Sequence, residues 1–279
     1  MRQFLKIFFA SLLAIVVFSV VAIIIMAGWI GSLATAERPA TGSKGVLYID
    51  LAQNINEQAQ DNPLSGLNTD DKYDTPGLFD MVRLIRHAKT DSLVKGIYIK
   101  CADNGNGFAT SDELRNALQD FKGSKKFIYA YADVISQRAY YVVNLADKVY
   151  CNPKGGLEWK GFALQYMFFK HTLDKLGIEP QIFYAGKFKS ATEPFRTDKM
   201  SDANRLQSAV FLNDLYNRFL LQTAGARNID TATLHGYANA MTIQTAADAV
   251  QYKLADGTRY DDEVKRRSGN GWVLGQMTK

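Results

Sequence analysis

An uncharged apolar run near the amino terminus constrains this chain more than any other feature. From Ile7 to Ile30, 24 consecutive positions carry no charged side chain. As a helix this run is roughly 36 Å long, enough to cross a hydrocarbon core of about 30 Å. Arg2 and Lys6 precede it, and the first charge after it is Glu37. Because positive flanks stay in the cytoplasm, residues 1–36 are predicted to form a single-pass anchor in the inner membrane. The bulk of the chain would then lie on the extracytoplasmic side.

A cleavable signal peptide is the alternative interpretation of the same run. Ala34-Thr35-Ala36 has the small-residue pattern of a cleavage site, so cleavage after Ala36 stays open. The apolar segment of a signal peptide is only about 7 to 15 residues long, which favours an uncleaved anchor. In both cases the remaining residues are exported.

Residues 37–44 form a short polar linker, and residues 45–279 form the exported part, long enough for one large domain or two small ones. The net charge of +5 comes from scattered Lys and Arg side chains, without the basic stripe of a nucleic-acid-binding protein. His87, His171 and His235 stand far apart and lack nearby partners, so no metal site is expected.

Short apolar runs rich in β-formers alternate with segments of helical periodicity in the exported part. The expected strands cover residues 45–51, 94–100, 126–132, 147–152 and 179–185. Most lack a clean polar alternation, which is typical of strands covered on both faces. Strands separated by helices predict an α/β fold with parallel pairing.

Four helices are predicted from periodicity and end signals. The first follows Thr75-Pro76 and has one apolar face, made of Leu78, Met81, Val82, Ile85 and Ala88. The second opens at Thr110, with Glu113 at capping-box spacing, and the third runs from about Leu164 to Leu176 and is ended by Gly177. The fourth is a long helix from Ser201 to about Thr223.

Cys101 and Cys151 each lie at or near the end of a strand-like run. They could pair in an oxidising compartment, but the sequence does not show that the two strand ends are neighbours. Two small buried apolar side chains are an equally good interpretation.

The stretch "GKFKS" holds two lysines, Lys187 and Lys189, just after an apolar run. No G-x-S-x-G motif occurs and no histidine stands in a marked context, so a Ser/His/Asp triad is not supported. A lysine can replace the histidine as a base only when it is neutral, and burial lowers its pKa from about 10.4. Lys189, beside Phe188, could be desolvated in this way, while Lys187 could equally be exposed.

Several motifs together resemble one known family. "GKFKSATEPF" followed by "DKMS", with "LFDMVRLIRHAKTD", "SQRAYYVVNLADKVYCNPKG" and "LDKLGIEPQIFYAG", is similar to the first half of bacterial signal peptide peptidase A in its long, two-repeat form. The resemblance implies a Clp/crotonase-like fold and a membrane-anchored Ser/Lys protease that degrades cleaved signal peptides and assembles as a homo-oligomer. It also implies that Lys189 is the general base and that Lys187 is not required.

The sequence departs from the family pattern where the nucleophile should stand. Alignment on "YY" puts Gln137 at the serine position, and Ser136 is one residue away, about 100° around a helix. Ser136 is therefore expected to start a helix rather than to attack. In the oxyanion loop "DNGNGF", Gly105 could offer a backbone N–H, but Asn106 replaces a glycine, so a flexible turn is equally possible.

These departures match the first repeat of the long form, which supplies the lysine while the second repeat supplies the serine. The chain ends at Lys279 without such a repeat, so it is expected to be inactive alone. A non-catalytic, membrane-bound scaffold that binds peptides is the main alternative. A CoA-binding crotonase-type enzyme shares the fold but has little use for export.

Overall fold

A computed structural model describes residues 2–34, 45–59, 77–267 and 274–275. Helix α1 (Arg2–Ala34) contains the segment Arg2–Met26, which is by length and composition able to cross a membrane and whose large apolar side chains are exposed. The predicted apolar helix is thus confirmed. The linker 37–44, the cleavage site at Ala36 and the Thr75-Pro76 helix start lie outside the described residues.

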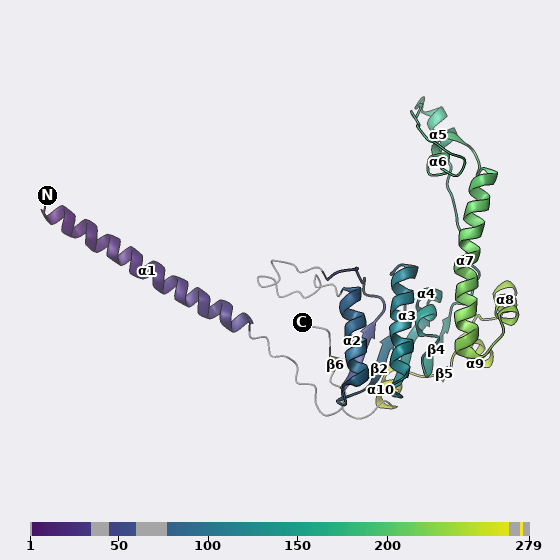
Figure 1. The fold of residues 1–279 in the computed structure, drawn as a ribbon, viewed down its shortest axis with the longest axis horizontal. Coiled ribbons are helices and arrows are strands. Elements are labelled where there is room, and N and C mark those ends of the chain that lie inside the picture. Colours follow the sequence, from purple (N-terminus) through teal and green to yellow (C-terminus); the bar gives the residue numbers. More distant parts are fainter. Residues whose placement is uncertain (1, 35–44, 60–76, 268–273, 276–279) are drawn as a thin grey trace.

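Within the described part of the chain, one parallel sheet forms the centre of the exported region (Figure 1). Its strands are β1 (Gly45–Asp50), β2 (Val94–Lys100), β3 (Phe127–Ile135), β4 (Lys148–Leu157), β5 (Gly257–Thr258) and β6 (Leu274–Gly275), in the order β5-β4-β3-β2-β1-β6. Every pairing is parallel. The predicted α/β class is confirmed, and the arrangement is consistent with a Clp/crotonase-like fold.

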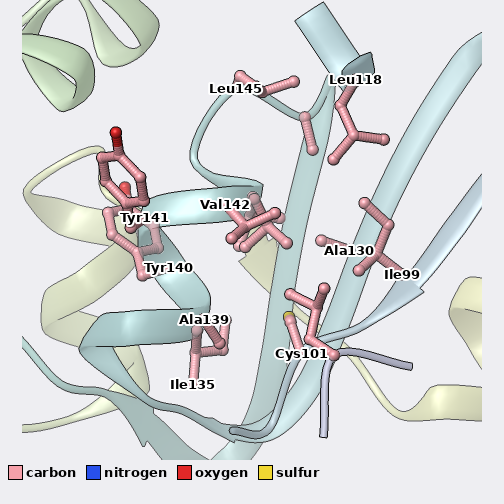
Figure 2. Close-up of a cluster of buried hydrophobic side chains, with 14 of the residues drawn as sticks. Ile99, Cys101, Leu118, Ala130, Ile135, Ala139, Tyr140, Tyr141, Val142 and Leu145 are labelled. Atoms are coloured by element: carbon pink, nitrogen blue, oxygen red, sulfur yellow. The ribbon is translucent and has the colours of Figure 1, made fainter. Parts of the chain in front are cut away.

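One face of the sheet packs against α2 (Leu78–Thr90), α3 (Phe108–Lys122) and α4 (Gln137–Val143). Figure 2 shows how strand side chains such as Ile99 and Ala130 meet Leu118 of α3 and Val142 of α4. These side chains are buried because alternate residues of each inner strand point to this face. The predicted α2 stripe is largely confirmed, with Leu78, Met81, Ile85 and Ala88 buried.

The opposite face is lined by tyrosines rather than by aliphatic residues. Tyr98, Tyr131 and Tyr150 form a second buried cluster with Val264 of α10 (Asp261–Arg267). The Tyr98 hydroxyl donates to the Asp261 carboxylate, which ties this helix to the sheet. The inner strands are therefore covered on both faces, as their apolar composition predicted.

Two helix starts differ from expectation. Helix α3 begins at Phe108, two residues before Thr110, because Gly107 already has the extended backbone of a cap and Phe108 packs its ring 4.6 Å from that of Tyr141. The predicted helix from Leu164 is only α5 (Lys170–Lys175), which ends before Gly177 at φ +70°. Residues 164–169 are irregular because no neighbouring element buries their apolar side chains.

The predicted strand at residues 179–185 is wrong. That segment is irregular, and its rings are open to solvent, with Phe183 92% and Tyr184 54% exposed. It lies on a projection that we call the arm, residues 163–211, where no sheet edge is available to pair with it. An apolar run predicts burial, and here no other part of the described chain provides it.

The long helix α7 (Asp202–Arg227) carries the arm (Figure 1). Ser201, where the sequence predicted the helix to begin, is its cap, and the helix continues four residues beyond Thr223. Its carboxyl-terminal half buries Phe219, Leu220 and Thr223, whereas Leu206 and Phe211 in its first half are exposed. Beyond the sheet this helix supports α5 and α6 (Glu193–Arg196), and it is followed by α8 (Thr231–Asn239) and α9 (Ala246–Gln251).

Cys101 and Cys151 are both free and buried. Strand β3 separates them, since the Cys101 amide bonds to Tyr131 while Cys151 pairs with Ala132. Burial raises the pKa of Cys151 to about 11. The interpretation as small buried apolar side chains is confirmed.

Phe121 and Phe183 offer a matched test of where the core lies. Phe121→Ala should lower the free energy of unfolding by about 3–5 kcal/mol, because a fully buried ring is removed and a cavity remains. Phe183→Ala should change it by less than about 0.5 kcal/mol. Urea unfolding followed by circular dichroism measures both, and equal effects would contradict the described core.

Candidate active site

The carboxyl ends of β2 and β3 bring two of the predicted site segments together. The Ser136 amide donates to the Ala102 carbonyl at 3.0 Å, and the Asn104 side-chain amide donates to the Arg138 carbonyl at 3.4 Å. The loop containing Gly105 and the start of α4 are therefore neighbours. This edge of a parallel sheet is where α/β proteins commonly bind ligands.

Helix α4 is held at this edge by two buried tyrosines. The Tyr140 hydroxyl donates to the Leu254 carbonyl at 2.7 Å, and the Tyr141 hydroxyl donates to the Asp112 carboxylate at 2.5 Å. Burial and this bond raise the pKa of Tyr141 to about 12. Burial alone would raise the pKa of Asp112, but its bonds from Arg218 and Tyr141 bring it below the usual value. The first turn of α4 thus has a fixed orientation.

Ser136 is the cap of α4, as the sequence analysis expected. Its backbone is extended, and its hydroxyl oxygen accepts a hydrogen bond from the Ala139 amide at 3.2 Å. A capping serine satisfies a helix-end N–H that would otherwise lack a partner. This contact gives Ser136 a structural task.

Gln137 is the first residue of α4 and is half-buried. Its side-chain carbonyl oxygen accepts a hydrogen bond from the Lys160 amide at 2.6 Å. The side chain therefore ties the start of α4 to the segment that leaves β4. An amide in this position can hold a neighbouring strand, but it has no hydroxyl or thiol with which to attack a carbonyl.

The loop after β2 is anchored by two asparagines that are almost fully buried. Asn106 accepts a hydrogen bond from the Ile55 amide at 2.7 Å and donates to the Asn104 side chain at 2.9 Å. Asn104 in turn donates to the Ser111 hydroxyl at 2.9 Å. The Asn106 side chain thus joins the loop to the segment after β1.

Gly105 lies between these two asparagines and is exposed. No atom of the described residues lies within 4 Å of the position that a Cβ would take there, so the space beside it is open. The anchored asparagines hold its backbone in place. Its role as an oxyanion donor stays a prediction.

Lys189 lies on the arm, in a turn between α5 and α6. Its amide donates to the Gly186 carbonyl at 3.3 Å, and Gly186 has φ +96°, a backbone conformation that favours glycine. The side chain is exposed, and among the described residues its ammonium group has neither a hydrogen bond nor an ion pair. The desolvation that the sequence suggested for Lys189 is therefore not provided by the described chain.

Lys187 is also exposed, with its ammonium 5.8 Å from the centre of the Phe188 ring. Both lysines belong to the arm, whereas Gln137, Ser136 and Gly105 belong to the sheet edge. Figure 1 shows α5 and α6 beyond the end of α7 that is farther from the sheet. Within the described residues, the predicted base and the predicted nucleophile position are thus not brought together.

The sequence analysis missed the buried carboxylate of Glu193, whose side chain is only 2% exposed. It accepts hydrogen bonds from the Ser201 hydroxyl at 2.5 Å and the Asn204 side chain at 2.8 Å. A signal was present, since Glu193 shortly precedes the Ser201 helix cap and lies next to Pro194. A carboxylate near a helix start is a common partner of its free N–H groups.

Comparisons with known proteins agree with the motifs. The model of peptidase family S49 matches residues 120–271, which include α4, the arm and α10. The chain is 29% identical over 252 residues to Protease 4 of Salmonella typhi, covering 85% of this chain and 40% of that protein. It is 33% identical over 196 residues to Protease 4 of Haemophilus influenzae, covering 68% and 32%.

A third relative is Serine protease SPPA, chloroplastic, of Arabidopsis thaliana, 26% identical over 177 residues, covering 63% of this chain and 26% of that protein. The chain therefore spans 40% or less of the length of each of these relatives. The family resemblance found in the sequence motifs is confirmed. This chain belongs to peptidase family S49.

Proposed function

We propose that this chain is the lysine-bearing unit of a membrane-anchored serine protease, with Lys189 as the general base and the nucleophilic serine on a second unit. The observation that carries the proposal is the separation of the two positions. Gln137 is engaged with Lys160 at the sheet edge, and Lys189 is exposed on the arm. A base without a nucleophile in reach needs one from elsewhere.

The second unit is a further repeat or another chain. Its serine hydroxyl would give its proton to the neutral amine of Lys189 while the oxygen attacks the peptide carbonyl. The protonated lysine then gives that proton to the leaving amine as the C–N bond breaks. In the second step Lys189 takes a proton from water, and the water oxygen attacks the acyl ester and releases the serine.

This chemistry requires that Lys189 be desolvated in the assembled enzyme. A free lysine has a pKa of about 10.4, and removal from water lowers it towards neutrality. The unit that supplies the serine should therefore also cover Lys189. Because one unit would both bring the serine and desolvate Lys189, only the assembled enzyme would be active.

The arm has the apolar surface that such a cover needs. Its exposed large apolar side chains include Met167, Leu176, Ile178, Phe183, Tyr184, Phe188, Phe195, Leu206, Val210 and Phe211. Clusters of exposed apolar side chains on this scale are typical of interaction sites. The homo-oligomer that the family resemblance implies would also bury apolar surface. A second copy of this chain carries Gln137 at the nucleophile position, so the unit that covers Lys189 and brings the serine is a further repeat or a different chain.

The substrates that we propose are peptides, including remnants of cleaved signal peptides. The names of the relatives, Protease 4 and Serine protease SPPA, support proteolysis. Helix α1 supports an enzyme attached to the membrane in which such remnants remain. The bulk of the chain would lie on the extracytoplasmic side, as the charges of Arg2 and Lys6 favour.

A non-catalytic scaffold is the second candidate. It is favoured by the hydrogen bond that gives Gln137 a structural role and by the exposure of Lys189. Such a protein would bind peptides or other proteases at the membrane without cleaving them. The two candidates differ in whether Lys189 is needed for turnover in cells.

The first prediction concerns activity. The purified chain should not hydrolyse casein, because Gln137, which has no nucleophilic oxygen, stands where the family resemblance places the serine. In cells that contain the serine-bearing unit, Lys189→Ala should reduce degradation of a labelled signal peptide by at least about 100-fold, the lower range for loss of a general base. Lys187→Ala, two residues away, should leave it unchanged. Casein turnover by the purified chain that depends on Lys189 would contradict the proposal.

A second prediction concerns the predicted nucleophile position, which Gln137 occupies. Gln137→Ser should not react with a fluorophosphonate probe, because no described contact brings Lys189 to the start of α4. Rapid labelling of this variant, lost again in Gln137→Ser with Lys189→Ala, would show that one chain can assemble the dyad.

A third prediction concerns the anchor. After an alkaline carbonate wash, the chain should stay in the membrane fraction, and its mass should include residues 1–36 because the apolar helix is too long for a typical signal peptide. A soluble species that begins at Glu37 would show cleavage after Ala36 instead.

A further inference from the structure

We propose that Glu193 is the positioning residue of Lys189, a buried carboxylate that fixes the turn carrying the lysine to the first turn of α7. The proposal rests on the proposed role of Lys189 and identifies what holds that lysine in place. Glu193 does not touch the reacting atoms. It acts through residues 184–192, which lie before it in the chain.

The carboxylate is joined to the start of α7 by several hydrogen bonds. One oxygen accepts from the Ser201 hydroxyl at 2.5 Å, and the other accepts from the Asn204 side chain at 2.8 Å and the Ser201 amide at 3.2 Å. Burial alone raises the pKa of Glu193, but these bonds and the charge of Arg196 hold it below its usual value. Glu193 is therefore an anion whose hydrogen-bond partners among the described residues are all donors.

The chain connects this anchor to Lys189 from the carboxyl-terminal side. The Glu193 amide donates to the Ser190 carbonyl at 3.0 Å, and the Lys189 amide donates to the Gly186 carbonyl at 3.3 Å. The turn from Ser190 to Glu193 thus leads directly to Lys189, which itself closes a second turn that begins at Gly186. Both turns are short, so a shift of Glu193 would move Lys189 with it.

A second connection reaches the other end of the same segment through Arg196. Its guanidinium lies 3.7 Å from the Glu193 carboxylate and stacks on Tyr184, 4.1 Å from the ring centre. It also donates to the Thr192 hydroxyl at 3.3 Å. Glu193 therefore holds residues 184–192 at both ends, with Lys189 between them.

This arrangement accounts for a carboxylate that is buried, together with Asn204, on an arm whose other side chains are exposed or only partly buried. Burial of a charge is costly unless hydrogen bonds satisfy it. A buried carboxylate at this position therefore indicates a function that a neutral side chain would not perform. The chain contains a matched exposed counterpart in Glu179, which also precedes a proline, Pro180, on the same arm. Of these two glutamates, only Glu193 is hydrogen-bonded to α7 within the described residues.

The test uses the full chain in detergent micelles, with its lysines reductively methylated with ¹³C and the Lys189 signal assigned from Lys189→Arg. Glu193→Gln replaces one carboxylate oxygen with an NH₂ group, which cannot accept a hydrogen bond from the donors on Ser201 and Asn204. It should shift the Lys189 signal and raise amide hydrogen exchange in residues 184–192 at least about tenfold, the factor expected for loss of a bond to a charged group. Glu179→Gln should change neither.

A swap variant separates positioning from general loss of folding. In Glu193→Gln with Asn204→Asp, the introduced amide can donate to the introduced carboxylate, so the bond between the two side chains is remade, while the Ser201 amide still lacks its carboxylate acceptor. Both readouts should therefore move back toward the wild-type values. An unchanged Lys189 signal in Glu193→Gln, or a swap variant no closer to wild type than Glu193→Gln, would overturn the proposal. Neither readout needs protease activity, so this test is independent of the activity experiment that tests Lys189 as the base.

Discussion

Helix α7, which carries the arm with Lys189, is tied to α3 and α4 through a buried charge, the guanidinium of Arg115 on α3. It donates to the Tyr141 carbonyl of α4 at 2.8 Å and to the Gln222 carbonyl of α7 at 3.1 Å, and it also bonds to Asn144. Burial lowers the pKa of Arg115 to about 10. Three helices meet at this side chain, so the direction of α7, and with it the position of the whole arm, depends on it.

The same anchoring divides the molecule into a packed region and an open one. Behind Arg115, the last turns of α7 bury Phe219 and Thr223 against the rest of the domain. Beyond it, the helix carries apolar side chains and Lys189 into solvent. The first half of the helix exposes apolar side chains, and the proposed covering unit would provide both their burial and the low polarity that a lysine base requires.

The inner strands, α2, the Ser201 helix cap and the Ser136 cap were predictable, because periodicity and capping act within a few residues. The placement of Lys189 was not. Its apolar neighbours Phe183 and Tyr184 predicted a buried strand, yet exposure is decided by whether a distant element covers them. The anchored Asn104–Asn106 pair and the buried Glu193 were missed for the same reason, since their partners lie 7 to 55 residues away.

The central claim is that Lys189 serves a serine that is not part of this chain. A fluorophosphonate with an amine-reactive arm, applied to native membranes, would label the catalytic serine and then join it to the nearest lysine, and mass spectrometry would identify both peptides. The account predicts a crosslink between the Lys189 peptide and a serine peptide outside residues 1–279. A crosslink from Lys189 to Ser136, or to any other serine within these residues, would contradict it.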